Sequence, residues 1–306
     1  MNDALASSGS QVHVPLVGRL MYHCLPIRRR VMLANLRRAF GGKIPEQDIV
    51  RIAQAHYAHG VRLVFEYLRF PFLSEQRRAA MVRLENEDAV LRAAMQGKGV
   101  LVLTGHFGLW EVATLAGLAQ FPQLHGRFHV TRRRLWPRWF NRWVTGRSHR
   151  AGLHIIPKQG AVERILDRLA AAEIVLFIYD QHAGGRSGVE GLLFGHPAWT
   201  FKTLALAALA TGAPVVPASS WREPDGRNVI RFEEALPLIE CDDPDEAIRA
   251  NTRVYNHAFE QLVLRHPEQW GMWMHRMWKG PPGTVKKPFI RWAAEQFAAR
   301  VGWLES

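Results

Sequence analysis

His106 and Glu111 are separated by four residues, and together they could act as a base that activates a hydroxyl group. On a continuous helix, residues five apart point about 140° away from each other, which would separate the two side chains. If His106 instead precedes a helix and Glu111 lies in its first turn, Glu111 can accept a hydrogen bond from one ring nitrogen. The other nitrogen is then left to remove a proton from a substrate. We also expect the positive end of that helix to keep His106 neutral at rest.

The residues around this pair predict where it lies in the fold. Residues 100–103 are apolar and stand between two glycines, which is typical of a strand buried on both faces. Residues 110–118 read as a helix, so His106 would lie at the end of a strand, the edge at which open α/β sheets bind ligands. The spacing alone is expected about once by chance in such a sequence. The alternative is that His106 caps the helix and Glu111 complements its dipole.

The order of four sequence blocks resembles that of a known family. Residues 104–111 (Thr-Gly-His-Phe-Gly-Leu-Trp-Glu), 179–181, 193–200 and 267–276 resemble bacterial lipid A biosynthesis acyltransferases, within the wider lysophospholipid acyltransferase superfamily. The resemblance runs from about Pro15 to Lys279. It implies transfer of an acyl group from an acyl carrier protein or coenzyme A thioester to a lipid hydroxyl. Two departures bear on the acceptor: Leu109 stands where the family often has Asn, and Met277 where a second Arg is common.

Several further residues are candidates for binding substrate. The resemblance implies arginines near the active site, and Arg132 and Arg150 best match those positions. A guanidinium can hold a phosphate or steady an oxyanion, as can backbone N–H groups near Gly108. Asp180 and Gln181 follow a second buried strand and reach the same sheet edge as His106, although Asp180 could also be a cap. The remaining candidates are Phe194 and Gly195, which could line an acyl or donor channel, and His275 and Arg276, polar residues within an aromatic run.

The charge of the chain points to an anionic partner. The formal net charge is +13, which suits lipid headgroups, an acidic carrier protein or nucleic acid, although no nucleic-acid-binding module is recognisable. The two cysteines, Cys24 and Cys241, form no metal-binding pattern, and we expect no metal and no cofactor. The sequence has neither a Gly-x4-Gly-Lys-Ser/Thr phosphate loop nor a Gly-x-Ser-x-Gly nucleophile elbow. These patterns give no support to nucleotide hydrolysis or to a covalent acyl-enzyme.

Aromatic and basic residues suggest a membrane surface. No stretch reaches the roughly 18 apolar residues of a spanning helix, whereas many members of the resembled family carry an N-terminal anchor. We therefore expect peripheral association with the cytoplasmic face of the inner membrane. Trp136, Trp139 and Trp143 recur at helical spacing beside arginines, which is typical either of a membrane interface or of a core-facing helix. Residues 289–297 form a second candidate membrane-seated stripe.

The alternation of apolar runs and helical patterns predicts an α/β fold, with a mainly parallel central sheet flanked by helices and a helical N-terminal region. We expect one acyltransferase domain over residues 1–306: helical over 1–96, an α/β core over 97–280, and an amphipathic tail over 281–306. Residues 184–197 are expected to be a flexible, glycine-rich loop.

The sequence thus predicts a membrane-associated O-acyltransferase in which Glu111 orients the base His106 and no metal takes part. The alternative is a non-catalytic adaptor that binds anionic membrane surfaces through the same arginines and tryptophans.

Overall fold

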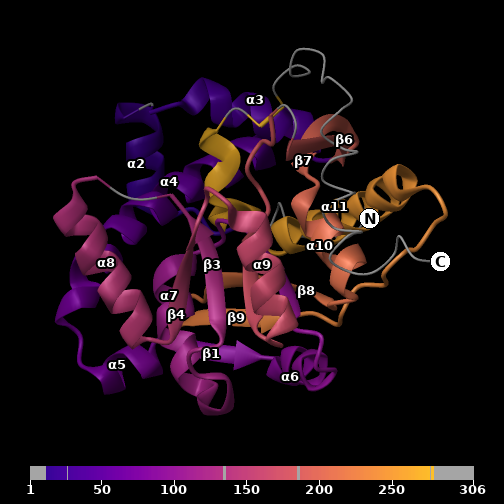
Figure 1. The fold of residues 1–306 in the computed structure, drawn as a ribbon. Helices are drawn as coiled ribbons and strands as arrows, with labels where there is room; N and C mark the ends of the chain where they lie inside the picture. Colours follow the sequence, from indigo (N-terminus) through magenta and orange to yellow (C-terminus); the bar gives the residue numbers. More distant parts are fainter. Residues whose placement is uncertain (1–11, 26, 134–135, 185–186, 276, 279–306) are drawn as a thin grey trace.

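The structure is a computed structural model that describes residues 12–25, 27–133, 136–184, 187–275 and 277–278 (Figure 1). The described helices are α2 (Leu16–Cys24), α3 (Arg29–Phe40), α4 (Glu46–Arg69), α5 (Glu75–Ala80), α6 (Glu87–Met95), α7 (Trp110–Gly117), α8 (Arg138–Arg150), α9 (Ala161–Ala170), α10 (Thr203–Thr211) and α11 (Pro244–Arg265). The strands are β1 (Val82–Glu85), β2 (Val100–Thr104), β3 (Phe128–Arg132), β4 (Leu153–Pro157), β5 (Ile174–Ile178), β6 (Gly188–Leu193), β7 (His196–Phe201), β8 (Val215–Arg222) and β9 (Asn228–Phe232). Short 3-10 helices lie at Phe70–Phe72 (η1), Leu118–Gln120 (η2), Pro122–Leu124 (η3), Pro267–Gln269 (η5) and Gly271–Met274 (η6).

Seven strands form one sheet in the order β1-β9-β8-β2-β5-β3-β4. All neighbours pair in parallel except β8 and β9, so β1 and β9 run against the other five strands. This confirms the predicted mainly parallel sheet flanked by helices. Strand β1 was not predicted; it adds an edge strand to the sheet from within the N-terminal region that otherwise reads as helical.

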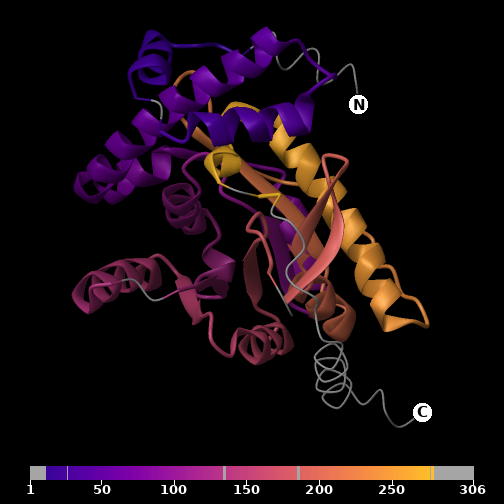
Figure 2. The ribbon, with the colours of Figure 1, turned by 90° about the horizontal axis from the view of Figure 1, so that it is seen from above.

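The central strand β2 is buried on both faces, as its apolar run predicts. Leu101 and Leu103 pack into the core cluster that includes α3, α4, α10 and α11. Val100 and Val102 pack into the cluster on the other face, with residues of α6, η2 and η3. Figure 2 shows the indigo N-terminal helices gathered at one end of the molecule, with α11 running alongside the sheet. The middle of the sheet is thereby enclosed, and its polar edge is where the chain can present functional groups.

One loop segment differs from the prediction, and the predicted tail is not tested. The glycine-rich residues 184–197 are not simply a loop, because β6 and β7 pair as an antiparallel hairpin from Gly188 to Phe201. Phe194 and Gly195 form its turn with φ values of 53° and 78°. The tail over residues 281–306, including the stripe at 289–297, lies outside the described residues.

The apolar pattern of α4 extends beyond the part of the helix that packs in the core. Ile49, Ile52 and Tyr57 are buried, whereas Val64, Phe65 and Leu68 near its end are 59–68% exposed. The hydrophobic periodicity therefore continues onto the surface, where it contributes to an exposed apolar face.

Candidate active site

The candidate site begins where two neighbouring strands end together. Thr104, the last residue of β2, lies opposite Ile178, the last residue of β5. The next residue, Tyr179, donates its backbone N–H to the carbonyl oxygen of Thr104 at 2.8 Å. His106 and Asp180 each follow the paired strand ends by two residues, so both reach the same edge. This confirms the prediction that Asp180 and His106 share one sheet edge.

Asp180 fixes the His106 ring. Its Oδ1 lies 2.8 Å from Nδ1 of His106, while its Oδ2 accepts the backbone N–H of His106 at 2.7 Å and the indole N–H of Trp270 at 2.9 Å. The side chain of Asp180 is fully buried, whereas that of His106 is 30% exposed. Because a carboxylate only accepts hydrogen bonds, this contact places the ring proton on Nδ1 and leaves the lone pair on Nε2. In this geometry Nε2 of His106 is free of Asp180 and can accept a proton.

Glu111 has a different partner from the predicted one. It lies in the first turn of α7, as expected, but its Oε2 accepts the hydroxyl proton of Tyr67 at 2.8 Å. The helix begins only at Trp110, whose ring packs edge-on against His106 with centroids 5.5 Å apart. The four-residue spacing predicted Glu111 as the acceptor for a ring nitrogen of His106. The pairing of β2 with β5 instead brings Asp180 to Nδ1 of that ring. This corrects the prediction that Glu111 would accept the hydrogen bond of the ring.

The charges around His106 also change the expected protonation. Burial disfavours the imidazolium, but the hydrogen bond and charge of Asp180 and the charge of Glu111 outweigh it and raise the pKa of His106. The two carboxylates thus favour the imidazolium, an effect opposite in sign to the one predicted for the positive end of α7. Asp180 and Glu111 both stabilise the imidazolium that forms when His106 takes a proton.

The backbone turn after β2 is held on several sides. Gly108 has a φ of 53°, and a Cβ there would lie 2.9 Å from the carbonyl oxygen of Ser220. Its N–H donates to the carbonyl oxygen of Gln269 at 2.9 Å. The carbonyl of Phe107 accepts from the Ser220 hydroxyl at 2.8 Å. The N–H of Gly108 itself is therefore committed to a structural hydrogen bond, which leaves neighbouring N–H groups as the candidates near Gly108 for binding an oxyanion.

His106 opens onto a cavity of about 540 Å³. Its lining comes from α4, the turn after β2, the start of α7, the segment after β5, η6 with the residue that follows it, and the residue before α3. The lining residues are Arg28, Leu63, Tyr67, His106, Gly108, Trp110, Gln181, His182, Gly271, Met272 and His275. The structure thus brings the predicted Gln181 and His275 to the cavity of His106. Sequence reasoning missed Arg28 and His182. His182 directly follows the predicted Asp180-Gln181 pair, whereas nothing distinguished Arg28 from its basic neighbours.

Other predicted substrate-binding residues do not line this cavity. Arg132 donates to the Thr145 hydroxyl at 3.1 Å; burial lowers its pKa, and the charge of Glu111 opposes that shift. Arg150 is exposed at the end of α8. Phe194 is buried against Phe40, Trp270 and Trp273 because the hairpin turn directs its ring into the core, and Gly195 occupies the same turn. Arg276 lies outside the described residues.

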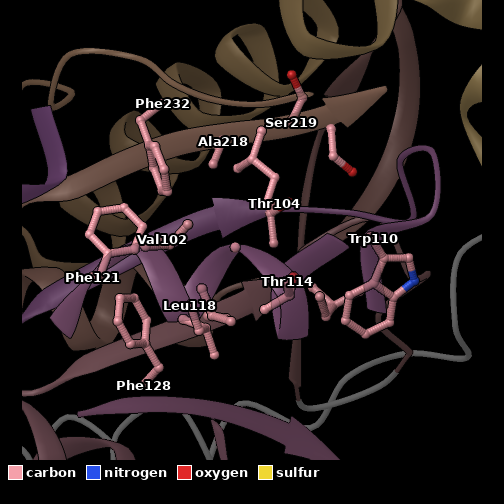
Figure 3. Close-up of a pocket in the computed structure, with 15 residues that line it drawn as sticks. Val102, Thr104, Trp110, Thr114, Leu118, Phe121, Phe128, Ala218, Ser219 and Phe232 are labelled. Atoms are coloured by element: carbon pink, nitrogen blue, oxygen red, sulfur yellow. The ribbon is translucent and has the colours of Figure 1, made fainter. Parts of the chain in front are cut away.

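A second, apolar cavity of about 50 Å³ lies beside the first (Figure 3). The two cavities share Trp110, which Figure 3 shows at one end, while Phe121, Phe128 and Phe232 gather at the other. Its volume is of the order of one or two water molecules. The indole of Trp110 therefore separates a polar cavity from a small apolar one.

Neither a metal centre nor a spanning helix is found in the described part of the chain. Over those residues no group of three or more His, Cys, Asp or Glu side chains is placed to hold a metal ion. Within the same ranges, none of the helices has the length and apolar content that crossing a bilayer needs.

Comparison with known proteins defines the class of this chain. Residues 11–280 match the bacterial lipid A biosynthesis acyltransferase family, so the chain belongs to that family. It is 27% identical over 217 residues to the phosphatidylinositol mannoside acyltransferase of Mycobacterium tuberculosis, a match that covers 68% of this chain and 64% of that protein. It is also 26% identical over 269 residues to the lipid A biosynthesis palmitoleoyltransferase of Escherichia coli, covering 87% and 83% of the two chains. The Mycolicibacterium smegmatis phosphatidylinositol mannoside acyltransferase is 24% identical over 78% of this chain and 76% of its own length.

Proposed function

We propose that this protein is a membrane-associated O-acyltransferase that moves a fatty acyl group from an acyl carrier protein or coenzyme A thioester to a lipid or glycolipid hydroxyl. The observation that carries the proposal is His106, oriented by Asp180 and opening onto the 540 Å³ cavity. Family membership supports the same reaction class. A cavity of this size lies within the range of about 300–1,000 Å³ typical of small-molecule sites.

The reaction needs one base and one proton donor. Nε2 of His106 removes the proton of the acceptor hydroxyl as the oxygen bonds to the thioester carbonyl carbon. The C–S bond then breaks, and the leaving thiolate takes the proton back from His106. Asp180 keeps the ring in the required tautomer throughout, and Glu111 adds a second negative charge that stabilises the transient imidazolium.

The carbonyl oxygen becomes negatively charged in the intermediate and needs hydrogen-bond donors. Gly108 does not supply one, but α7 starts two residues later and has no side-chain cap. Helix N-termini stabilise developing negative charge, so we assign the first N–H groups of α7, those of Trp110 and Glu111, to this role. The apolar cavity beside Trp110 provides a hydrocarbon-like wall where the acyl chain meets the polar site.

The exposed apolar side chains support association with a membrane. Figures 1 and 2 both place α2, the end of α4 and α8 along the same, left-hand side of the molecule. These elements carry large exposed side chains: Leu16, Leu20, Val64, Phe65, Leu68, Trp139 and Trp143. The exposure of Trp139 and Trp143 supports the membrane-interface interpretation of α8. Together with the net charge of +13, they favour an anionic bilayer as the surface from which the acceptor enters.

An acyl-transfer assay tests the proposal. Purified protein is offered acyl carrier protein and coenzyme A thioesters with several lipid acceptors, and the products are identified by mass spectrometry. We expect His106→Gln to lose at least about 100-fold in turnover while still folding, because general-base catalysis contributes about that much or more. Vesicle binding without transfer to any acceptor would favour the adaptor alternative, and near-normal turnover of His106→Gln would exclude His106 as the base.

A further inference from the structure

The cavity at His106 is rich in hydrogen-bond donors. In addition to His106, the polar residues that line it are Arg28, Tyr67, Gln181, His182 and His275. None of the described residues that line it is an Asp or a Glu. A guanidinium, imidazoles and an amide without a carboxylate among them give the cavity a positive character.

Two carboxylates next to the lining residues are engaged in hydrogen bonds and do not line the cavity themselves. Asp180 is fully buried behind His106 and accepts from His106 and Trp270. Glu111 accepts from the Tyr67 hydroxyl, and partial burial with the charge of Glu111 raises the pKa of Tyr67, so this phenol stays a donor. Neither carboxylate neutralises Arg28 through a direct contact.

Arg28 is held in place by its backbone and by the segment after η6. It has a φ of 51°, in the left-handed region that non-glycine residues seldom adopt. Its Nη1 donates to the carbonyl oxygen of Met274 at 3.0 Å. Asn35 donates to the carbonyl oxygen of His275 at 2.6 Å, and Tyr57 donates to that of Ile27 at 2.7 Å. These bonds fix the guanidinium of Arg28 and the backbone of His275 and Ile27 near the cavity.

We propose that Arg28, His182 and His275 form a binding site for a phosphate group of a substrate, next to the base His106. Arginine binds phosphate oxygens through charge-assisted hydrogen bonds, and imidazole N–H groups add further donors around a tetrahedral anion. The acyl-transfer role of this cavity rests on the proposed function, whereas phosphate binding does not require it. The phosphate comes either from the headgroup of the acceptor lipid or from the phosphopantetheine arm of the donor, and the experiment separates these two sources.

The first arm of the test measures binding without catalysis. Glycerol 3-phosphate stands for a phosphorylated headgroup, phosphopantetheine for the donor arm and glycerol for an uncharged control; each is titrated into the full chain by calorimetry. We expect one phosphorylated probe to bind and glycerol not to bind. Arg28→Gln should weaken that binding about 10- to 100-fold, the range for hydrogen bonds to a charged group. Arg30→Gln is the matched control, because it removes the same charge from an exposed residue that does not line the cavity.

The second arm identifies the source of the phosphate. If the headgroup supplies it, Arg28→Gln and His182→Asn raise KM for a phosphorylated acceptor about 10-fold or more and leave KM for its dephosphorylated form and for the donor unchanged. If the donor supplies it, KM for the donor rises instead. His182→Asn keeps the test informative if Arg28→Gln lowers the melting temperature.

The outcomes separate this proposal from the proposed function. Phosphate binding that persists in His106→Gln without any acyl transfer in the wild type supports the phosphate site and contradicts the acyltransferase role. Acyl transfer with the same binding and KM values in wild type, Arg28→Gln and His182→Asn overturns the phosphate site. Failure of both phosphorylated probes to bind the wild type overturns it as well.

Discussion

Asp180 and His106 are joined side chain to side chain because their strands end in register: Oδ1 lies 2.8 Å from Nδ1, and each residue stands two positions beyond the last paired residues of β5 and β2. The carboxylate that orients the proposed base therefore comes from a different βα unit, not from the helix that follows the histidine. Burial of Asp180 makes the arrangement rigid, and the partial exposure of His106 keeps Nε2 accessible.

The first prediction concerns Asp180→Asn. The amide can place its NH₂ group against Nδ1, which favours the wrong tautomer and occupies Nε2 with the proton. We expect kcat to fall at least about 100-fold. Because Asp180 raises the pKa of His106, the acidic limb of kcat/KM against pH should also move to lower pH.

Glu111→Gln is the matched variant for this prediction. It removes a negative charge that also raises the pKa of His106, but not the hydrogen bond to Nδ1. We expect the acidic limb to move in the same direction by less, with a smaller loss of kcat than in Asp180→Asn. A larger loss in Glu111→Gln than in Asp180→Asn would show that Glu111 is the orienting carboxylate.

The second prediction concerns Gly105, which lies between the end of β2 and His106. A Cβ at this position would stand 2.6 Å from Oδ2 of Asp180 and 2.9 Å from the ring of Phe259. Gly105→Ala should therefore displace Asp180 and overpack the core, at a cost of about 1–3 kcal/mol in the free energy of unfolding. Activity should fall by more than this loss of stability explains, which turnover and thermal melts measured on the same sample can show.

Gly60→Ala provides the control for Gly105→Ala. Gly60 lies inside α4, and a Cβ there would meet no atom within 4 Å. Alanine is favoured over glycine in a helix by up to about 1 kcal/mol, so this variant should melt at the same or a higher temperature with unchanged turnover. Equal behaviour of the two alanine variants would refute the steric argument for Gly105.

The sequence predicted this site in part, and the missing part has a physical reason. The apolar run of β2 and the following helix located His106 at a sheet edge, and β5 brought Asp180 to the same edge. Which carboxylate meets the ring depends on β5 being the immediate neighbour of β2, and strand order is set by tertiary packing that no local spacing encodes. The β6–β7 hairpin was missed for a related reason. Its turn at Phe194-Gly195 lacks the Asn-Gly or Asp-Gly signal that usually marks such hairpins.

The third prediction concerns pH and the buried His59 beneath the Gly108 turn. Burial, with the nearby charges of His56, Arg222 and Arg62, lowers the pKa of His59 to about 3, against the opposing hydrogen bond to Gly108. The unfolded chain takes up this proton near pH 6.5, whereas the folded chain does not. Above about pH 6.5 this proton does not affect the free energy of unfolding. Below about pH 6.5, down to the pKa of the folded chain, each pH unit lowers the free energy of unfolding by about 1.4 kcal/mol.

His59→Asn should remove this pH dependence. We expect the slope of unfolding free energy against pH, measured by urea titration between about pH 6 and 5, to decrease by about one proton relative to the wild type. Burial also lowers the pKa of His56, so the variant should retain part of the slope. Parallel slopes for wild type and His59→Asn would contradict a neutral, buried His59.

The last prediction concerns the exposed face of α8. Trp139 in this helix is 66% exposed. One turn further on, the exposed ring of Trp143 is accompanied by a basic group, because the guanidinium of Arg147 lies 4.9 Å from its centroid. If this face lies in the interfacial region of a bilayer, Trp139→Ala loses about 2 kcal/mol of apolar burial and binds vesicles with anionic lipid about 10-fold or more weakly.

Leu192→Ala is the control, because Leu192 is 57% exposed but belongs to β6, which both ribbon views place away from α8. Cosedimentation with vesicles measures both variants, and since both side chains are exposed, their melting temperatures should match the wild type. Equal vesicle binding by Trp139→Ala and the wild type would remove α8 from the membrane-facing surface.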